Sequence, residues 1–540
     1  FGRHFVAAEQ PTARTRIAME RPARTVAALP ASLAPSGSVE LSPFDLANQG
    51  RAIPMVWFYR ESLDPALLMA ALRETLKSYP VLCGRYGTPP NRVSLSNHGV
   101  PVDVVHHETS LNDAVSHLHA GQPAIFAEDA HLPFVPDKSA MDPDRGSADA
   151  PLLAIKLTLF PDATPRGSPP PRRPPATGAN SGTSPPARRA IGPASASSPT
   201  GRRANGSSAA GRAHASDMAA GDEGGGTAIG VLVQHAVLDV DALVTFVANW
   251  SRVFRGLAVE PEPDHERLSV AKLHVLDAVL DGRGAAEPPE GFKMRVIEPG
   301  APAAPAFHPV LASISGGRAC VVPFDSAALE QLKAAAMREV PAGSFVSTDD
   351  VLTARAWRAL CAVRCGQLGI ALDSDEISTC SRASNFRKLS RLRAGYCANG
   401  VSQVWTELPV HQLLTMSVAE VALRLRADLQ ACTAAVVVQR AHWLHRQQRA
   451  GRKAVQAFDA NALTFVISSW GFDWQATDFG ARPFCCDHGA HVPIVATLLP
   501  RPGGDGVHLY ASGTQEGLEH FVRLVTQKLM PPLLDMPALF

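Results

Sequence analysis

The sequence predicts an α/β protein built from two domains. Its 540 residues are enough for two substantial domains. Short runs of β-branched and apolar residues alternate along the chain with helical patterns, as is typical of α/β folds. A polar, proline-rich stretch divides these segments into two groups. We therefore expect an N-terminal domain at 39–258, a crossover linker at 259–316 and a C-terminal domain at 317–540.

Two further stretches lack the composition of a folded core. Residues 1–38 are rich in Ala, Arg, Pro and Ser, and residues 161–226 are rich in Pro, Ser, Gly, Ala and Arg. Neither stretch can bury enough apolar surface to offset its conformational entropy. We therefore predict a disordered N-terminal tail and a disordered insertion. The arginines of the tail are also compatible with an organelle transit peptide.

In the first half, periodic patterns predict a regular order of strands and helices. An N-cap at Asp64 followed by Pro65 predicts a helix that stops before Pro80. A second helix is expected with Asp241 as its N-cap, because apolar residues recur at helical spacing up to Phe254. Strands are expected at 53–59, 79–86, 102–105, 152–160 and 229–233.

The second half shows a similar mixture of patterns. The acidic sequence Ser-Thr-Asp-Asp at 347–350 is typical of a helix N-terminus. Two more helices are expected, one from Ser417 to about Arg449 and one from Gln515 to Leu529. Strands are expected at 319–323, 377–384, 463–468, 492–499 and 506–511.

Charge and composition narrow the possible function classes. The 51 basic and 50 acidic residues give a net charge of +1, so the charge does not favour nucleic acid as a partner. No apolar run approaches the roughly 20 residues that span a bilayer. The nine cysteines lie mostly in apolar segments, which indicates buried free thiols and a reducing compartment, here the cytoplasm. The Cys-Cys-Asp-His cluster at 485–488 lacks zinc-ligand spacing, so we expect no metal site.

One strand-to-helix connection carries a candidate catalytic pair. His235 follows a buried strand pattern, and Asp239 comes four residues later. A neutral imidazole can accept a proton from a hydroxyl near neutral pH, so His235 suits a general base. Attack of the hydroxyl oxygen on a thioester carbonyl gives an oxyanion that needs hydrogen-bond donors. Because the chain has no Gly-x-Ser-x-Gly turn, a covalent serine intermediate is not indicated.

Seven stretches, in order along the chain, resemble the BAHD acyltransferases of plants and fungi, which transfer acyl groups from coenzyme A thioesters to alcohols or amines. These stretches extend from residue 41 to residue 480. They are Leu-Ser-Pro-Phe-Asp at 41–45, Tyr-Pro-Val-Leu-Cys-Gly-Arg at 79–85, residues 226–239 with Trp250, residues 347–358, Asn-Phe-Arg at 385–387, Gly-Tyr-Cys-Ala-Asn at 395–399, and Ser-Ser-Trp at 468–470 with Asp-Phe-Gly at 478–480.

The resemblance implies a chloramphenicol-acetyltransferase-like fold, in which two domains of mixed sheets and helices enclose a channel. Ser469 and Trp470 match a strand that borders this channel in the family. The implied partners are an acyl-CoA, as co-substrate, and a small alcohol or amine. No cofactor, no nucleic acid and no membrane span are expected, and the implied protein is a monomeric enzyme of secondary metabolism.

The resemblance also assigns roles to individual residues. His235 corresponds to the family's catalytic base, and Asp239 to an aspartate that turns away from the substrate and holds the loop. Asp478 and Gly480 belong to a structural motif remote from the catalytic histidine. The family pairs this motif's aspartate with an arginine, which we place at Arg387.

Two departures from the family pattern leave other functions open. Val240 stands where the family usually has glycine, and Ala481 and Arg482 replace a Trp-Gly pair in a loop that the family associates with coenzyme A. These changes are compatible with an inactive homologue that binds a small ligand. A condensation-type domain that takes acyl groups from a carrier protein is the second alternative, although such domains usually have His-His-x-x-x-Asp-Gly.

Overall fold

The computed structural model of the protein describes most of the chain. The described residues are 23–27, 37–87, 91–116, 121–137, 141, 150–161, 225–267, 288–299, 316–456, 463–488, 492–501, 504–528 and 530–534. The predicted insertion at 161–226 therefore lies outside the described residues, except at its ends. Most of the predicted tail at 1–38 also lies outside them.

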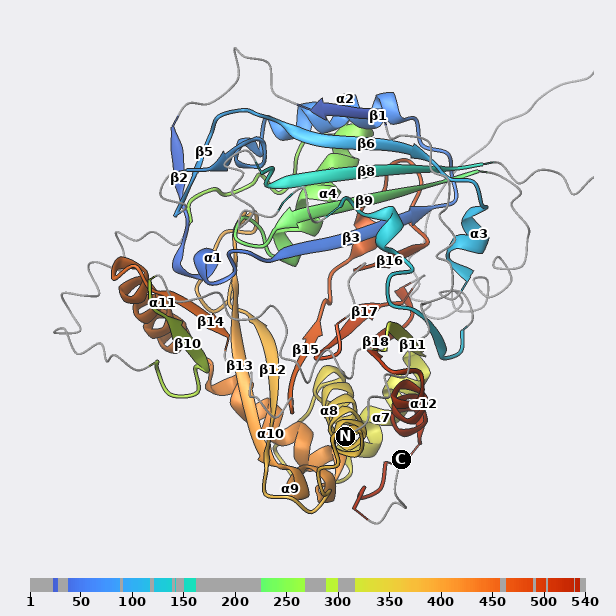
Figure 1. The fold of residues 1–540 in the computed structure, drawn as a ribbon, viewed down its shortest axis with the longest axis vertical. Coiled ribbons are helices and arrows are strands. Elements are labelled where there is room, and N and C mark those ends of the chain that lie inside the picture. Colours follow the sequence, from blue (N-terminus) through green and yellow to red (C-terminus); the bar gives the residue numbers. More distant parts are fainter. Residues whose placement is uncertain are drawn as a thin grey trace, which may run out of the picture. The chain divides into compact units, whose positions relative to one another are not determined.

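A six-stranded mixed sheet organises the first half of the chain (Figure 1). Only β6 and β8 run parallel, and the other neighbours are antiparallel. Across the sheet, the strands are β1 (Ala23–Ala27), β6 (Val100–His106), β8 (Leu153–Phe160), β9 (Gly226–Gln234), β3 (Ala52–Tyr59) and β16 (Cys485–Asp487).

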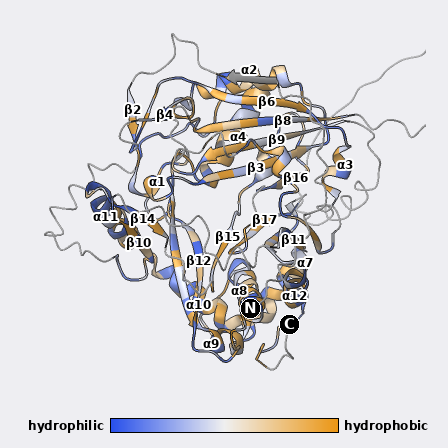
Figure 2. Cartoon of the chain, viewed as in Figure 1, coloured by the Kyte–Doolittle hydropathy of each residue, from blue (hydrophilic) through white to orange (hydrophobic). Residues whose placement is uncertain are grey.

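Two helices pack on this sheet and on each other. They are α2 (Pro65–Leu76) and α4 (Val240–Phe254). Leu72 of α2 and Phe246 of α4 are fully buried with Trp57 of β3 and Ile229 of β9 in one apolar cluster. Figure 2 shows this apolar character on α4 and on the strands of the sheet. The cluster makes β9 and α4, and hence their connection, a rigid support.

A seven-stranded mixed sheet organises the second half. The neighbours β12–β15 and β15–β17 are parallel, and the remaining pairs are antiparallel. Its strands, in order, are β13 (Val401–Pro409), β12 (Ile377–Asn385), β15 (Thr464–Ser469), β17 (Val495–Pro500), β18 (Val507–Gly513), β11 (Arg318–Phe324) and β7 (Ala124–Ala127). The associated helices are α7 (Ser326–Met337), α8 (Thr348–Leu368), α9 (Val410–Thr415), α10 (Val418–Ala431) and α12 (Gln515–Thr526).

Each half of the chain contributes an edge strand to the other half's sheet. Strand β16 from the second half pairs with β3, and β7 from the first half pairs with β11. The sequence patterns did not predict either strand. These exchanged strands join the two halves through backbone hydrogen bonds.

Smaller elements complete the described chain. The predicted linker at 259–316 contains a strand that pairs with a strand of the second half. The remaining elements are β2 (Ser38–Glu40), β5 (Arg92–Ser94) and β4 (Arg85–Tyr86) in a three-stranded sheet, β10 (Met294–Ile297) and β14 (Lys453–Gln456) in a two-stranded sheet, the helices α1 (Pro43–Ala47), α3 (Leu111–Ala114) and α11 (Ala434–Arg449), and short 3₁₀ turns at Pro80–Cys83, Leu132–Phe134 and Trp474–Ala476.

The structure confirms the mixed α/β class and corrects several predicted segments. The single helix expected at 417–449 is two helices, because Thr433 caps a new N-terminus by accepting a bond from Val436 N. The strand expected at 79–86 is a 3₁₀ turn followed by a two-residue strand. The predicted disordered tail contains β1, which pairs along the edge of β6.

Two predictions about the chain's chemistry can be compared with the described residues. All nine cysteines are buried free thiols, as predicted. None of the described helices is long and apolar enough to cross a bilayer.

Candidate active site

The candidate site lies where β9 ends and α4 begins. Every residue of β9 is buried, and the strand is hydrogen-bonded on both sides, to β8 and β3. A turn at 235–237 follows, and His235 N donates to Arg51 O at 2.8 Å. Helix α4 then starts with Asp239 as its N-cap, so the predicted cap at Asp241 is wrong. The carboxylates of Asp239 and Asp241 lie at the N-terminus of α4, where the helix dipole favours negative charge.

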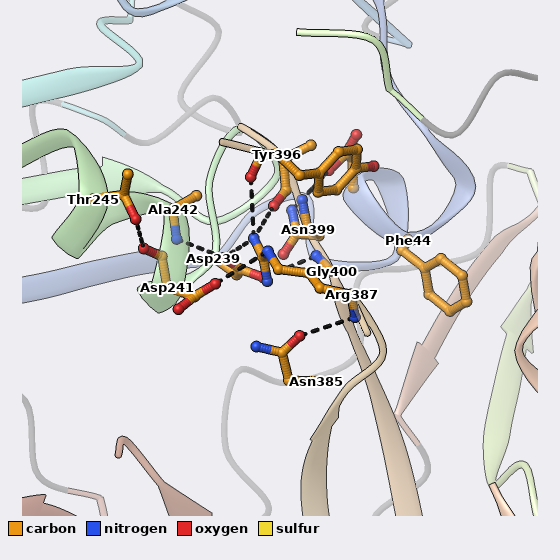
Figure 3. A network of polar contacts seen from close by, with 12 residues as sticks. Phe44, Asp239, Asp241, Ala242, Thr245, Asn385, Arg387, Tyr396, Asn399 and Gly400 are labelled. Atoms are coloured by element: carbon orange, nitrogen blue, oxygen red, sulfur yellow. Dashed lines mark hydrogen bonds and ion pairs between the residues drawn. The ribbon is translucent and has the colours of Figure 1, made fainter. Parts of the chain in front are cut away.

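Asp239 is enclosed by donors on both of its oxygens. Oδ1 accepts from Ala242 N at 3.0 Å and from Arg387 Nη2 at 2.8 Å. Oδ2 accepts from Arg387 Nη1 at 2.7 Å and from Gly400 N at 2.8 Å (Figure 3). The residue is 2% exposed. With four donors and no open side, Asp239 anchors the loop and is poorly placed to contact a substrate.

Arg387 is the ion-pair partner of Asp239. Its guanidinium also contacts the Asp241 carboxylate at 3.1 Å and donates to Ala398 O at 2.9 Å. Burial alone would lower the pKa of Arg387, but Asp239, Asp241 and Tyr396 together outweigh this effect and raise the pKa. Gly400 is required beside it, because a Cβ at that position would lie 2.5 Å from Arg387 Nη1. The predicted pairing of Arg387 with Asp478 is therefore wrong.

Asp478 lies at the other end of α4. It contacts Arg255 Nη1, at the helix C-cap, at 3.3 Å. Helix α4 has 15 residues, so roughly 22 Å separate this end from the end that carries Asp239. Phe479 packs edge-on against Trp250, and Gly480 has a φ of 83°, which favours glycine. The Asp-Phe-Gly motif at 478–480 therefore contacts only other parts of the fold in the described bonds and ring contacts, and it is remote from His235.

His235 combines an accessible face with a buried nitrogen. The residue is partly exposed, yet its Nδ1 is buried and has no hydrogen bond of normal geometry. Burial lowers the pKa of His235 below its usual value, and the Arg51 guanidinium acts in the same direction. The residue's own backbone, Asp239 and the Asn399 side chain oppose this shift of the pKa. The imidazole is therefore neutral at pH 7, as a general base must be.

Two side chains from other parts of the chain hold the loop's carbonyl groups. Asn399 Nδ2 donates to His235 O at 2.7 Å, and Arg267 Nη2 donates to Val237 O at 3.1 Å. Sequence reasoning missed both roles. Asn399 lies in one of the seven recognised stretches but received no function there, and Arg267, in the predicted linker, has no local signal in the sequence. Only the folded chain brings them to His235.

The two channel candidates lie on a different strand. Ser469 ends β15 and is exposed. Trp470 is half-buried, donates from Nε1 to Ser468 Oγ at 2.9 Å and packs edge-on against His488. No hydrogen bond, ion pair or ring contact described for these residues joins them to His235, so their role in a channel stays a prediction.

The thiol nearest to the site is poorly suited to act as a nucleophile. Cys397 is near the site, but burial raises the pKa of its thiol to about 12. A thiol with that pKa is almost entirely protonated at pH 7 and is a poor nucleophile. Within the described ranges, no group of three or more His, Cys, Asp or Glu side chains is arranged to hold a metal ion.

Comparisons with known proteins agree with this architecture. The sequence pattern of the Transferase family matches residues 222–527, and a comparison with curated protein sequences finds no match. Three similar solved structures are vinorine synthase (17% identity, TM-score 0.56, covering 95% of this chain and 99% of that chain), TRI101 of F. sporotrichioides (16%, 0.57, 90% and 97%) and TRI101 of F. graminearum (15%, 0.60, 91% and 98%). The family pattern covers more than half of the chain and includes His235, Asp239 and Arg387. The chain therefore belongs to the Transferase family, the family of the BAHD acyltransferases.

Proposed function

We propose that this protein transfers an acyl group from an acyl-CoA thioester to a hydroxyl or amine of a small molecule, with His235 as the general base. The observation that carries the proposal is the combination of a partly exposed, neutral imidazole with a loop fixed from four sides. A base held in one position can meet an acceptor at hydrogen-bonding distance without reorganising. The solved complexes of TRI101 with coenzyme A support the choice of donor.

The proposed reaction is a direct transfer. His235 accepts the proton of the acceptor's O–H or N–H group while its oxygen or nitrogen forms a bond to the thioester carbonyl carbon. The carbon–sulfur bond of the resulting tetrahedral intermediate then breaks, and the imidazolium returns the proton to the departing thiolate, which leaves as coenzyme A. No covalent enzyme intermediate is needed, and the raised pKa of the Cys397 thiol supports its absence.

The test is thiol release from acetyl-, malonyl-, aromatic and long-chain acyl-CoAs in the presence of mixed alcohol and amine acceptors. We expect acceptor-dependent release from the unaltered protein and a loss of at least about 100-fold in His235→Ala, because general-base catalysis contributes roughly 10²- to 10⁴-fold. Because burial lowers the pKa of His235, activity should persist below pH 6.5 and fall only at lower pH. His411→Ala in α9 is the matched control, and thermal unfolding checks that each variant is folded.

Each other outcome of this test selects an alternative. Binding of an acyl-CoA without turnover of any acceptor would favour an inactive, ligand-binding homologue, in keeping with Val240, Ala481 and Arg482. Neither binding nor turnover would favour a domain that takes its acyl group from a carrier protein. Release that persists in a folded His235→Ala protein would remove His235 from the mechanism.

A further inference from the structure

A buried carboxylate in the first half of the chain is connected to the catalytic loop through two intermediaries. Asp45 is the third residue of α1 and is 0% exposed. It closes the helix N-terminus, since Oδ2 accepts from Ser42 N at 2.8 Å and Asp45 N donates to Ser42 Oγ at 3.2 Å. Only the first of these bonds uses the carboxylate, so most of its hydrogen-bonding capacity is left for other donors.

The remaining capacity of Asp45 is taken by the two residues that hold the His235 loop. Oδ1 accepts from Asn399 N at 3.0 Å and from Asn399 Nδ2 at 2.8 Å. Oδ2 accepts from Arg267 Nη1 at 2.7 Å. Burial alone would lower the pKa of Arg267, but Asp45 acts in the opposite direction and the pKa of Arg267 is raised above its usual value. The same two side chains donate onward to the carbonyl groups of His235 and Val237.

These bonds determine the orientation of the Asn399 amide. Its Nδ2 has two hydrogens, and one goes to Asp45 Oδ1 while the other goes to His235 O. Both partners are acceptors only, so a flipped amide would place its oxygen against two other oxygens. The unflipped amide leaves Asn399 Oδ1 buried and without a hydrogen bond of normal geometry, as is His235 Nδ1.

The Asn399 side chain also lies close to the imidazole. It is one of the groups that raise the pKa of His235, after the residue's own backbone and Asp239. The same side chain therefore fixes the backbone of His235 and borders its ring.

We propose that Asp45 is a positioning residue for His235: by fixing Asn399 and Arg267, it holds the loop that carries this imidazole. This inference rests on the proposed function only in taking His235 as the base. Asp45 does not contact the substrate or the imidazole. Its contribution therefore belongs to the rate of the chemical step more than to the binding of acyl-CoA.

The kinetic test compares Asp45→Asn with Asp350→Asn. Asp350 closes the N-terminus of α8 in the same way and is also 0% exposed, but its partners lie in the second half. We expect Asp45→Asn to lower kcat roughly 10- to 100-fold, as small displacements of reacting groups do, and to leave the KM for acyl-CoA near its original value. Asp350→Asn should change neither kcat nor this KM.

Further variants separate positioning from a loss of folding. Asp45→Asn leaves the buried Arg267 guanidinium without its charged partner, and this variant could unfold for that reason alone. In that case Asp45→Asn is combined with Arg267→Met, which removes both charges of the pair. Asn399→Ala combined with Asp45→Asn should be only somewhat slower than Asn399→Ala, because the two changes share the Asn399 connection and only the Arg267 connection is left to lose. Losses of kcat that multiply in the double variant, or a kcat that falls only with the unfolded fraction, would overturn the proposal.

A spectroscopic measurement keeps this inference separate from the proposed function. Selective ¹⁵N labelling of histidine reports the surroundings of each imidazole by NMR, and His235→Gln identifies the His235 signals. We expect the His235 ring signals to shift in Asp45→Asn but not in Asp350→Asn. Unchanged His235 signals in Asp45→Asn would refute the role of Asp45. If the expected shift appears although the unaltered protein transfers no acyl group, only the proposed transferase reaction is refuted.

Discussion

Two helices of this protein begin with the same local motif and use it differently. Helix α1 starts with Ser42 and Asp45, and α8 starts with Ser347 and Asp350. In both motifs, the aspartate accepts a bond from the serine N at 2.8 Å and donates its own N–H to the serine Oγ at 3.2 Å. Both carboxylates are fully buried. The local chemistry is therefore nearly identical, and any functional difference arises from what else each carboxylate binds.

The outward contacts of the two aspartates are different. Asp45 accepts hydrogen bonds from Asn399 and Arg267, which in turn donate to the loop that carries His235. Asp350 binds two guanidinium groups, from Arg382 of β12 at 3.1 Å and Arg426 of α10 at 2.8 Å. It therefore joins three elements of the second half and has no described contact with the loop. A motif that is recognisable in the sequence can thus serve the site or only the fold, depending on its tertiary partners.

The largest expected change in stability tests the structural side of this comparison. Asp350→Ala leaves Arg382 and Arg426 without their shared carboxylate, and breaking a buried ion pair on one side costs about 3–5 kcal/mol. Arg382 retains an ion pair with Asp349, so the lower end of this range is expected. Denaturant unfolding measures the loss, and turnover per folded molecule should be unchanged. Reduced turnover in the folded fraction would mean that α8 also supports the site.

The unfolding free energies of these variants also depend on the pH of the measurement, because the buried His508 has a shifted pKa. Burial lowers the pKa of His508 to about 4 from the usual 6.5, with Arg501 acting in the same direction and Asp487 opposing it. Between these pH values the unfolded chain binds a proton that the folded chain does not, so stability falls as the pH is lowered from 6.5 to 4. The full difference corresponds to about 3 kcal/mol.

Unfolding free energies measured from pH 7 to pH 4 test the contribution of His508. In His508→Asn, the slope of stability against pH should be shallower than in the unaltered protein, because one titrating group has been removed. His98→Asn changes an exposed histidine and is the control. Equal slopes in the two variants would assign the acid sensitivity to other groups, such as His235 and His265, whose pKa values burial also lowers.

The sequence predicted those parts of the fold that depend on neighbouring residues. The cap at Asp64, the cap at 347–350 and the strand before His235 are local patterns, and the structure has them. The break at Thr433 was missed, because an apolar helical pattern continues across it without a glycine or proline. The strands β7 and β16 have only four and three residues, and each finds its partner in the other half of the chain.

The prediction of the candidate site was limited in the same way, because several of its contacts join residues that are distant in the sequence. His235 and Asp239 could be singled out because they lie four residues apart in one connection. The partner of Arg387 was predicted wrongly, since pairing between distant charges depends on the folded positions of Asp239 and Asp478. The contributions of Asn399 and Arg267 are tertiary in the same sense, because they act on carbonyl groups of the loop, and backbone groups carry no residue-specific signal.

The smallest expected effect sharpens the comparison by removing only the cap. Ser347→Ala loses the hydroxyl that accepts from Asp350 N, and loss of a serine cap costs about 1 kcal/mol. Ser417→Ala makes the same change at α10, where the partner carboxylate of Glu420 is exposed, so about 0.5 kcal/mol is expected. Both variants should keep full activity. Ser42→Ala should cost about as much as Ser347→Ala in unfolding free energy, but it should also lower kcat, because Ser42 Oγ, which accepts from Asp45 N, helps to hold Asp45 in place. Equal activity in all three serine variants would show that Asn399 and Arg267 hold Asp45 without help from the cap.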